Sequence, residues 1–281
     1  MGGKSTYVEV QPSPPLRRFV TSYVGYRISG YDAGIHVGVP SPTITVIIPF
    51  DDPIELAWRG ELPSRFGSLA SGLGTEPISI FHDGCQHGVQ LALTPVGARV
   101  LLGVPASEIG NIVVSLTDLL GTAAPELEQR MASEEAWTAR FAVLNEVLTR
   151  LVRTKTIQRK LEPDRHLTSA WQLLTESDCP RIQAVADEIG WSRRHLITKF
   201  RAEFGIAPKD AARVARFDRS YRLLRSALPQ SMADISVQCG YYDQAHMARE
   251  WREFAGSAPT VWRANEEFAF VQDTSTVPTE Q

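Results

Sequence analysis

Residues 181–208 read RIQAVADEIGWSRRHLITKFRAEFGIAP, and residues 231–259 read SMADISVQCGYYDQAHMAREWREFAGSAP. The two stretches are diverged copies of one plan. Matching positions lie 50 residues apart up to Gly190 and Gly240, and 51 residues apart in the second half of each stretch. One residue is therefore added in the turn of the second copy. Each copy predicts a short helix, a glycine turn and a second short helix, which is a helix-turn-helix unit.

The second helix of such a unit lies in the major groove of DNA, so we expect one face of that helix to be buried and the other exposed. Gly190 supplies a turn in which a side chain would strain the backbone. Ser192 and Asp243 are the expected caps, because their side-chain oxygens accept an otherwise unpaired backbone N–H. The side chains expected to face inward are Leu196, Phe200, Met247 and Trp251.

The outward-facing side chains sort by chemistry into two roles. Arginine binds guanine through two hydrogen bonds, glutamine suits adenine, and histidine donates to base acceptors. The expected base-reading residues are Arg194, Ile197, Thr198, Gln244, His246 and Arg249. The expected phosphate contacts, which position a helix without reading sequence, are Arg193, Arg201, Arg252 and Arg263. For any one residue a solvated helix face is the alternative, but the paired placement in both copies favours DNA reading.

A connector helix is predicted between the copies, opened by Pro208 and running to about residue 227. Its inward candidates are Ala212, Phe217, Leu223 and Leu224. Such a connector would hold both reading helices rigidly. Separated by one turn of DNA, about 34 Å, they would enter two successive major grooves. One chain would then read a bipartite site without dimerising.

The stretch from Asp164 to Arg263 resembles the AraC/XylS family of bacterial transcription regulators. The resemblance rests on Ile189-Gly190, Ser192, Leu196, Phe200, Gly205-Ile206-Ala207-Pro208, Arg216-Phe217, Leu223-Leu224, Ile235, Cys239-Gly240-Tyr241, Asp243-Gln244, Arg249, Gly256, Pro259 and Arg263. The chain departs from the family at a few positions. Serine replaces the usual alanine at 220 and 236, Met247 and Trp251 replace phenylalanine, and Ala211 replaces a common aromatic residue.

The resemblance implies a cytoplasmic regulator of transcription, usually an activator that contacts RNA polymerase. It also implies an N-terminal domain that senses a small molecule or mediates dimerisation, and no cofactor. Two other classes remain open. One is a DNA-targeted alkyl-acceptor or cysteine enzyme, in which Cys85 lies beside His82 and His87. The other is a protein-interaction module that has lost DNA binding.

Composition excludes several classes. The chain has 281 residues, of which 43% are hydrophobic and 22% charged, as in a soluble globular protein of two domains. Cys85, Cys179 and Cys239 lie far apart, which argues against a disulfide framework or a zinc finger and fits a reducing cytosol. No apolar run is long enough to span a membrane, and no signal peptide is evident.

The charge is distributed unevenly along the chain. The net charge is −3, yet residues 164–265 carry 15 Lys and Arg against 12 Asp and Glu. The basic excess therefore lies in the repeat, where it would favour contact with phosphates.

The fold expected is α+β with four regions. These are a β-rich sensor or regulatory domain at 1–121, a helical linker at 122–163, the tandem helix-turn-helix domain at 164–265, and an acidic tail at 266–281. Short runs rich in Val, Ile and Thr, punctuated by proline and glycine, predict a small sandwich or barrel that loosely resembles cupin-type sensor domains. The expected strands are 35–39, 43–48, 54–58, 66–70, 78–81 and 89–93.

A long helix is predicted from Ser133 to Arg153, with Ser133 as its cap. Trp137, Phe141, Leu144, Leu148 and Leu151 recur at helical spacing and form a narrow apolar stripe. The stripe is consistent with a helix packed on its own domain or with a homodimer seam through 133–153. Thr154–Pro163 is the expected linker.

An effector pocket would be lined by the strands of residues 35–93, with Trp58, Phe66 and Phe81 as candidate walls. His82, Asp83 and His87 lie close together, but they lack the H-x-H pattern and following glutamate of a cupin metal site. We therefore expect no metal.

Overall fold

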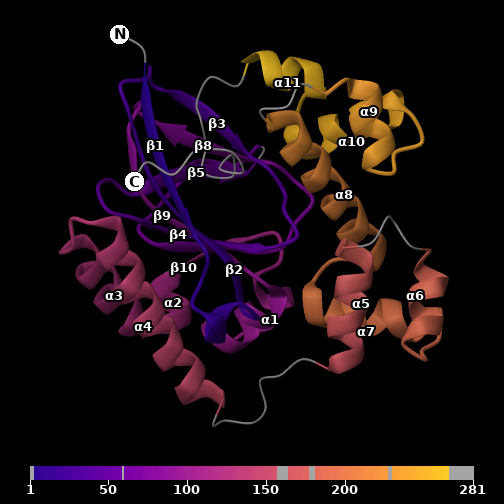
Figure 1. The fold of residues 1–281 in the computed structure, drawn as a ribbon, viewed down its shortest axis with the longest axis horizontal. Helices are drawn as coiled ribbons and strands as arrows, with labels where there is room; N and C mark the ends of the chain where they lie inside the picture. Colours follow the sequence, from indigo (N-terminus) through magenta and orange to yellow (C-terminus); the bar gives the residue numbers. More distant parts are fainter. Residues whose placement is uncertain (1–2, 59, 157–163, 177–180, 227–229, 266–281) are drawn as a thin grey trace.

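The computed structural model describes residues 3–58, 60–156, 164–176, 181–226 and 230–265 (Figure 1). A β-rich N-terminal domain occupies one side of the molecule and a helical C-terminal domain the other. The expected α+β fold, with a β-rich domain followed by two helix-turn-helix units, is confirmed. Among the described residues no helix is long and apolar enough to cross a membrane.

The N-terminal domain is a sandwich of two antiparallel sheets. The large sheet has the order β1-β2-β9-β4-β7-β10, formed by Lys4–Val10, Val20–Ser29, Gln86–Leu93, Ile44–Pro49, Leu69–Ser71 and Val113–Ser115. The small sheet has the order β3-β8-β5-β6, formed by Gly34–Gly38, Ile78–His82, Ile54–Trp58 and Ser64–Phe66. Side chains alternate across each strand, so one face of each sheet supplies the core between them, which includes Val24, Ile47, Leu69, Ile54, Leu56 and Ile80.

Five of the six expected strands are confirmed to within a few residues, as β3, β4, β5, β8 and β9. The expected strand at 66–70 is wrong. Phe66 ends β6 in the small sheet and Leu69 begins β7 in the large sheet, so the chain crosses between the sheets at this point. The sequence analysis also missed β1, β2 and β10. β2 contains a glycine in its interior, Gly25, and a glycine at such a position weakens a strand signal.

Helices cover the outer face of the large sheet. They are η1 (Pro14–Leu16), α1 (Pro95–Gly97), η2 (Ala98–Leu102), η3 (Ala106–Ile109), α2 (Leu116–Leu120), α3 (Ala123–Ala132) and α4 (Trp137–Thr156). Ile44, Val46 and Ile48 of β4 share one buried core with Phe141 and Leu144 of α4. This outer core is therefore as much a part of the domain as the core between the sheets.

The prediction that Ser133 caps a helix from 133 to 153 is wrong at its start. Ser133 instead ends α3, where its hydroxyl donates to the Arg130 carbonyl, and α4 begins at Trp137. The chain turns between the two helices, and the carbonyl of Glu134 accepts a hydrogen bond from Arg140 at 2.8 Å. Most of the apolar stripe is buried in this domain's own core, as a packed helix requires. Residues 157–163 of the expected linker lie outside the described residues.

The C-terminal domain consists of seven helices in the described residues. They are α5 (Arg165–Glu176), α6 (Ile182–Glu188), α7 (Arg193–Phe204), α8 (Pro208–Arg225), α9 (Met232–Gln238), α10 (Gln244–Ala255) and α11 (Pro259–Asn265). The connector helix is confirmed as α8, which starts at Pro208. Phe217 and Leu224 are buried as expected, whereas Ala212 and Leu223 are only partly buried.

Candidate nucleic-acid interface

Two helix-turn-helix units lie at the two ends of α8, which joins them (Figure 1). The first unit is α6 and α7, and the second is α9 and α10. α6 and α9 have 7 residues each, and α7 and α10 have 12 each. Gly190 and Gly240 both have φ of 72°, a left-handed conformation that glycine adopts without strain. The added residue lies in the second turn, where Tyr242 is 93% exposed.

Both expected caps are confirmed. The Ser192 hydroxyl accepts the backbone N–H of His195 at 3.2 Å, and the Asp243 carboxylate accepts that of His246 at 2.6 Å. Each reading helix therefore starts at a side chain that the sequence specifies.

The side chains expected to face inward do so. Leu196 and Phe200 of α7, and Met247 and Trp251 of α10, are at most 1% exposed. Phe200 stacks on Trp171 of α5, with ring centroids 5.7 Å apart, and Trp251 packs edge-on against Phe217 of α8 at 5.0 Å. These contacts fix which face of each reading helix remains outside.

The outer faces carry most of the predicted DNA contacts. The exposed residues are Arg193, Arg194, Thr198 and Arg201 on α7, Gln244, Arg249 and Arg252 on α10, and Arg263 on α11. Ile197 is half-buried. The Thr198 hydroxyl donates to the Arg194 carbonyl at 3.0 Å, which leaves its methyl group as the outward feature. Neither Arg194 nor Arg249 is buried, so both can reach a ligand.

His246 differs from the other predicted base readers, because both of its ring nitrogens have partners inside the unit. Its Nδ1 accepts the N–H of Tyr242 at 3.3 Å, and its Nε2 lies 3.6 Å from Glu250. Its ring meets Tyr241 edge-on at 5.4 Å. The first unit has a matching pair that the sequence analysis missed, Trp191 and His195, at 4.6 Å. The two histidines therefore brace the turns of their units.

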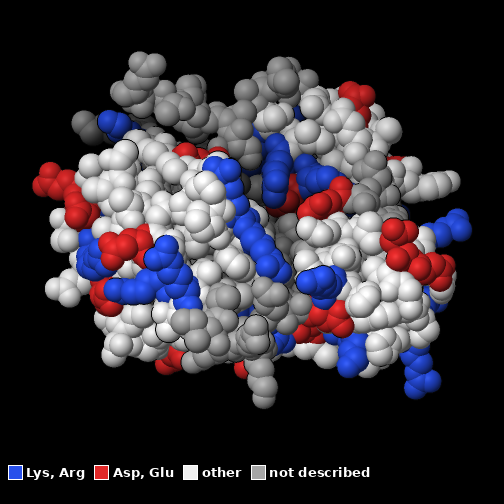
Figure 2. All heavy atoms as spheres, turned by 60° about the horizontal axis from the view of Figure 1, so that its bottom comes forward, with Lys and Arg blue, Asp and Glu red and all other residues white. Residues whose placement is uncertain are grey.

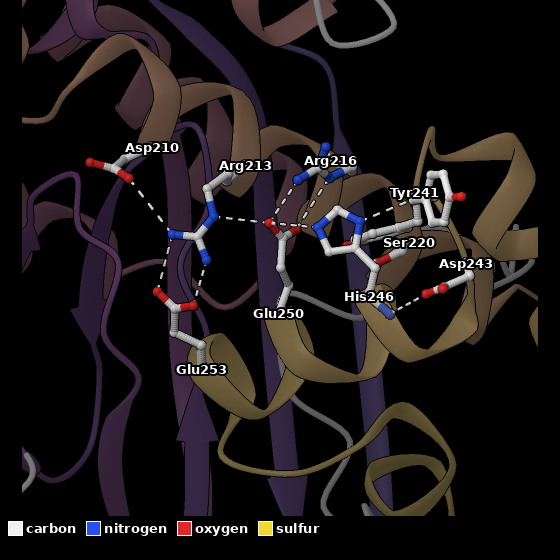
Figure 3. A network of polar contacts seen from close by, with 10 residues as sticks. Asp210, Arg213, Arg216, Ser220, Tyr241, Asp243, His246, Glu250 and Glu253 are labelled. Carbon is white, nitrogen blue, oxygen red and sulfur yellow. Dashed lines mark hydrogen bonds and ion pairs between the residues drawn. The ribbon is translucent and has the colours of Figure 1, made fainter.

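A buried polar network anchors α10 to α8 (Figure 3). Glu250 is 4% exposed and accepts hydrogen bonds from Arg213 at 2.9 Å and Arg216 at 2.6 Å. Arg213 also binds Glu253 and lies 3.7 Å from Asp210. Burial lowers the pKa of Arg213, but hydrogen bonds to Glu253 and Glu250 outweigh burial and raise it. The sequence analysis missed this network.

Ser220 explains one departure from the family pattern. The Trp251 indole N–H donates to its hydroxyl at 2.9 Å, and the hydroxyl donates to the Phe217 carbonyl at 2.7 Å. The Tyr241 hydroxyl lies 3.3 Å away, and burial raises the pKa of that phenol. Alanine could not satisfy the buried indole, so serine pairs with the tryptophan that replaces phenylalanine.

The first unit is also attached to the N-terminal domain by polar contacts. Arg99 of η2 forms a bidentate ion pair with Glu203 of α7, at 2.8 and 2.6 Å. Ser107 of η3 donates to the Ala202 carbonyl at 2.8 Å. The hydrogen bond to Glu203 raises the pKa of Arg99. We call these contacts the interdomain clamp; they attach the C-terminal end of α7 to the β-rich domain.

A cavity of about 700 Å³ lies between the open end of the sandwich and the helices α5 and α8. Its walls include Ser22, Val24, Thr45, Gln90, Trp171, Asp218 and Tyr221. The side-chain oxygen of Gln90 is buried there without a hydrogen-bond partner among the described residues. Arg17, Arg18, Arg219 and Arg222 also line this interdomain cavity. Figure 2 shows a run of Lys and Arg along the middle of one face, where the two halves of the molecule meet.

The predicted effector walls do not come together. Phe81 is wrong as an inner wall, because it pairs with Glu55 across β8 and β5 and so lies on the outer face of the small sheet. Trp58 and Phe66 lie on the inner face, but of the two only Trp58 lines a cavity there, and its volume is about 60 Å³. Side chains fill the sandwich, and the larger space lies at its open end.

The residues of the cysteine-enzyme alternative have other partners. His82 accepts the Gly84 N–H at 3.2 Å, and His87 contacts Arg140 at 2.9 Å. Cys85 is exposed in the turn between β8 and β9.

Comparison with known proteins agrees with this geometry. Residues 185–265 match a family model described as "Helix-turn-helix domain", of the AraC type. The fold is similar to that of ToxT from Vibrio cholerae, with a TM-score of 0.55 at 8% identity, over 94% of this chain and 98% of that one. Another ToxT structure has a TM-score of 0.52 at 10% identity, over 98% of this chain and 99% of that one. An AraC-type regulator from Chromobacterium violaceum is 24% identical over 36% of this chain and 94% of its own, with a TM-score of 0.33. No curated protein sequence matches.

The expected resemblance is confirmed for the C-terminal domain: residues 185–265 form an AraC-type helix-turn-helix domain, and the chain as a whole has a two-domain fold similar to that of ToxT. These findings support a DNA-binding transcription regulator.

Proposed function

We propose that this protein regulates transcription by reading a bipartite DNA site with α7 and α10 as a rigid pair. The observation that supports the proposal most is the matched geometry of the two units. The capped reading helices have equal length, and each buries one face and exposes the arginines of the other. With α8 between them, both helices enter successive major grooves on one face of the duplex.

Arg194, Ile197 and Thr198 read one half-site, and Gln244 and Arg249 read the other. Arg194 and Arg249 are the guanine readers, since a guanidinium binds O6 and N7 together. Arg193, Arg201, Arg252 and Arg263 contact phosphates. We assign His246 to holding the turn of the second unit, because its nitrogens are engaged there.

Selection of bound duplexes from a random-sequence pool gives the operator, and gel-shift titration in increasing salt then tests the assignments. Affinity falls steeply with salt, as phosphate contacts require. Arg194→Ala weakens operator binding by about 1–3 kcal/mol and relaxes preference at its own base pair. Arg201→Ala weakens binding to all sequences about equally.

Arg65→Ala is the matched control, since Arg65 is an exposed arginine on the small sheet. It leaves binding unchanged. Identical behaviour of Arg194→Ala and Arg201→Ala would contradict the sorting of base and phosphate contacts. Binding that ignores salt would contradict DNA recognition itself and favour a protein-interaction module.

The interdomain cavity is the proposed effector site. Its volume of about 700 Å³ suits a small molecule, and the unpartnered Gln90 oxygen calls for a hydrogen-bond donor. One ToxT structure has a bound unsaturated fatty acid, and another has (E)-4-(8-methylnaphthalen-1-yl)but-3-enoic acid. An effector here would contact both domains and alter how the interdomain clamp holds α7.

Thermal-shift measurements with a small-molecule library test this site, with Gln90→Leu as the variant. An effector that raises the Tm of the wild-type protein loses that effect in Gln90→Leu, because the leucine offers no acceptor. Retention of the full shift would place the effector elsewhere.

From the family resemblance we also propose that the protein acts in the cytoplasm and activates transcription by contacting RNA polymerase. In vitro transcription from a promoter that carries the operator tests this role. A homodimer through 133–153 would have to use the outer face of α4, since the apolar stripe is largely buried. Sedimentation with and without operator measures that association.

A further inference from the structure

A second cavity, of about 410 Å³, lies on the outer face of the large sheet beside the first turns of α4. We call it the α4 pocket; its lining is Lys4, Thr6, Arg27, Ser29, His87, Glu135, Trp137 and Arg140. Strand register brings the sheet residues together, since Thr6 pairs with Arg27 and Arg27 with His87 across β1, β2 and β9. β1 and α4 lie on the opposite side of the molecule from α7 and α10 (Figure 1).

Gly25 of β2 determines how α4 meets the sheet. A Cβ at this position would lie 2.5 Å from the Trp137 ring, so the indole rests where only glycine leaves room. The next turn of α4 then carries Arg140 over the rings of Phe50 and Trp137, at 4.2 and 4.9 Å from their centroids. Arg140 is 6% exposed, and its Nε donates to the Glu134 carbonyl.

Two guanidinium groups converge on one imidazole nitrogen. Arg140 Nη1 lies 2.9 Å from His87 Nε2, and Arg27 Nη2 lies 3.5 Å from the same atom. The other nitrogen, Nδ1, lies 3.4 Å from Asp51. This pattern assigns the ring proton to Nδ1 and the lone pair to Nε2. Burial, reinforced by Arg27, lowers the pKa of His87, so the imidazole is neutral and offsets neither positive charge.

The pocket thus holds more positive than negative charge. Lys4, Arg27 and Arg140 face it, opposed by Glu135 at its lining and Asp51 behind the imidazole. In the part of the chain that the structure describes, no carboxylate lies within 4.0 Å of the Arg140 or Arg27 guanidinium. A buried cation without a counter-ion is costly, and an incoming anion would remove that cost.

We propose that the α4 pocket binds the phosphate group of a small molecule between Arg27 and Arg140. Planar guanidinium forks match phosphate oxygens in pairs. Lys4, Thr6 and Ser29 add further donors, which suit the several acceptor oxygens of phosphate better than the two of a carboxylate. A phosphate so held would tie α4 to β1 and β2.

Calorimetric titration of the full chain with inorganic phosphate, at constant ionic strength, tests the proposal. Wild-type protein binds phosphate at this site more tightly than succinate, a dicarboxylate. Arg27 is exposed, so Arg27→Ala keeps the fold, and it weakens binding by at least about tenfold. Arg65→Ala, on the other sheet, leaves this binding unchanged.

The NMR titration of His87, assigned by its loss in His87→Gln, gives a second readout at the site. Bound phosphate places negative charge beside the imidazole and raises its pKa, an effect that packing alone would not produce. The proposal is overturned if Arg27→Ala binds phosphate as tightly as wild type, if succinate binds equally well, or if phosphate leaves the His87 titration unmoved.

Discussion

The two helix-turn-helix units have the same backbone plan but are held by different means. The second unit has a separate core, which Val39 of the N-terminal domain joins, and a buried charge network with α8. The core of the first unit continues into the N-terminal domain, and the interdomain clamp holds the end of α7. The polar contacts that orient α10 therefore lie inside the C-terminal domain. The orientation of α7 depends also on an ion pair and a hydrogen bond to the N-terminal domain, through which we expect a second site to influence this half of the reader.

The largest effect is expected on the stability of the second unit, which depends on the buried polar network between α10 and α8. Glu250→Ala leaves Arg213 and Arg216 without their buried partner, at a cost of about 3–5 kcal/mol. The Tm of the C-terminal unfolding transition measures the loss. Glu253→Ala is the control, because Glu253 is exposed and its ion pair contributes about 1 kcal/mol or less. Equal losses in both variants would show that the buried network does not anchor α10.

Next in size is the loss of a base contact in each unit. Arg249→Ala weakens operator binding by about 1–3 kcal/mol, as Arg194→Ala does, but relaxes preference in the other half-site. Selection of duplexes with each variant measures this directly. If both variants relax the same half-site, the two units do not read separate halves.

A smaller effect is expected where the first unit depends on the other domain. Arg99→Ala removes the bidentate ion pair to Glu203, which reduces the protection of α7 against amide exchange by about 1–2 kcal/mol. Protection in α10 stays the same, since no clamp contact reaches it. Hydrogen exchange read by mass spectrometry follows both helices at once. Loss of protection in both would mean that the units are not held independently.

The smallest effects come from the caps, where the units are alike. Ser192→Ala and Asp243→Ala each remove one N-terminal hydrogen bond, at a cost of about 1 kcal/mol. Thermal unfolding of the two variants compares them. Similar losses of unfolding free energy in the two variants would confirm that both caps stabilise their helices equally. A large difference would show that the units share only their backbone arrangement.

The sequence predicted the reading helices well because their signals are local. Ser192 and Asp243 lie directly before the helices they cap, and the spacing of Phe200 and Trp251 sets the buried faces. The connector was likewise marked by Pro208. These features depend on residues within one or two turns, where helix periodicity and capping act.

The features that the sequence analysis missed depend on contacts between residues far apart in the sequence. Arg99 and Glu203 are 104 residues apart, and Arg213 and Glu250 are 37 apart, so their pairing follows only from the fold. Arg140 resembles any exposed helix arginine in the sequence, yet it is buried over the ring of Trp137, for which Gly25 in a distant strand leaves room. Phe81 was misplaced because strand register decides which face it occupies.

The most direct test of the rigid two-groove reader is a change in the spacing of its operator. Insertion of five base pairs between the selected half-sites turns one of them to the opposite face of the duplex, since one helical turn is about 10 base pairs. We predict that affinity in a gel shift then falls by at least as much as in Arg249→Ala. Unchanged affinity for the respaced operator would contradict two reading helices held at a fixed separation.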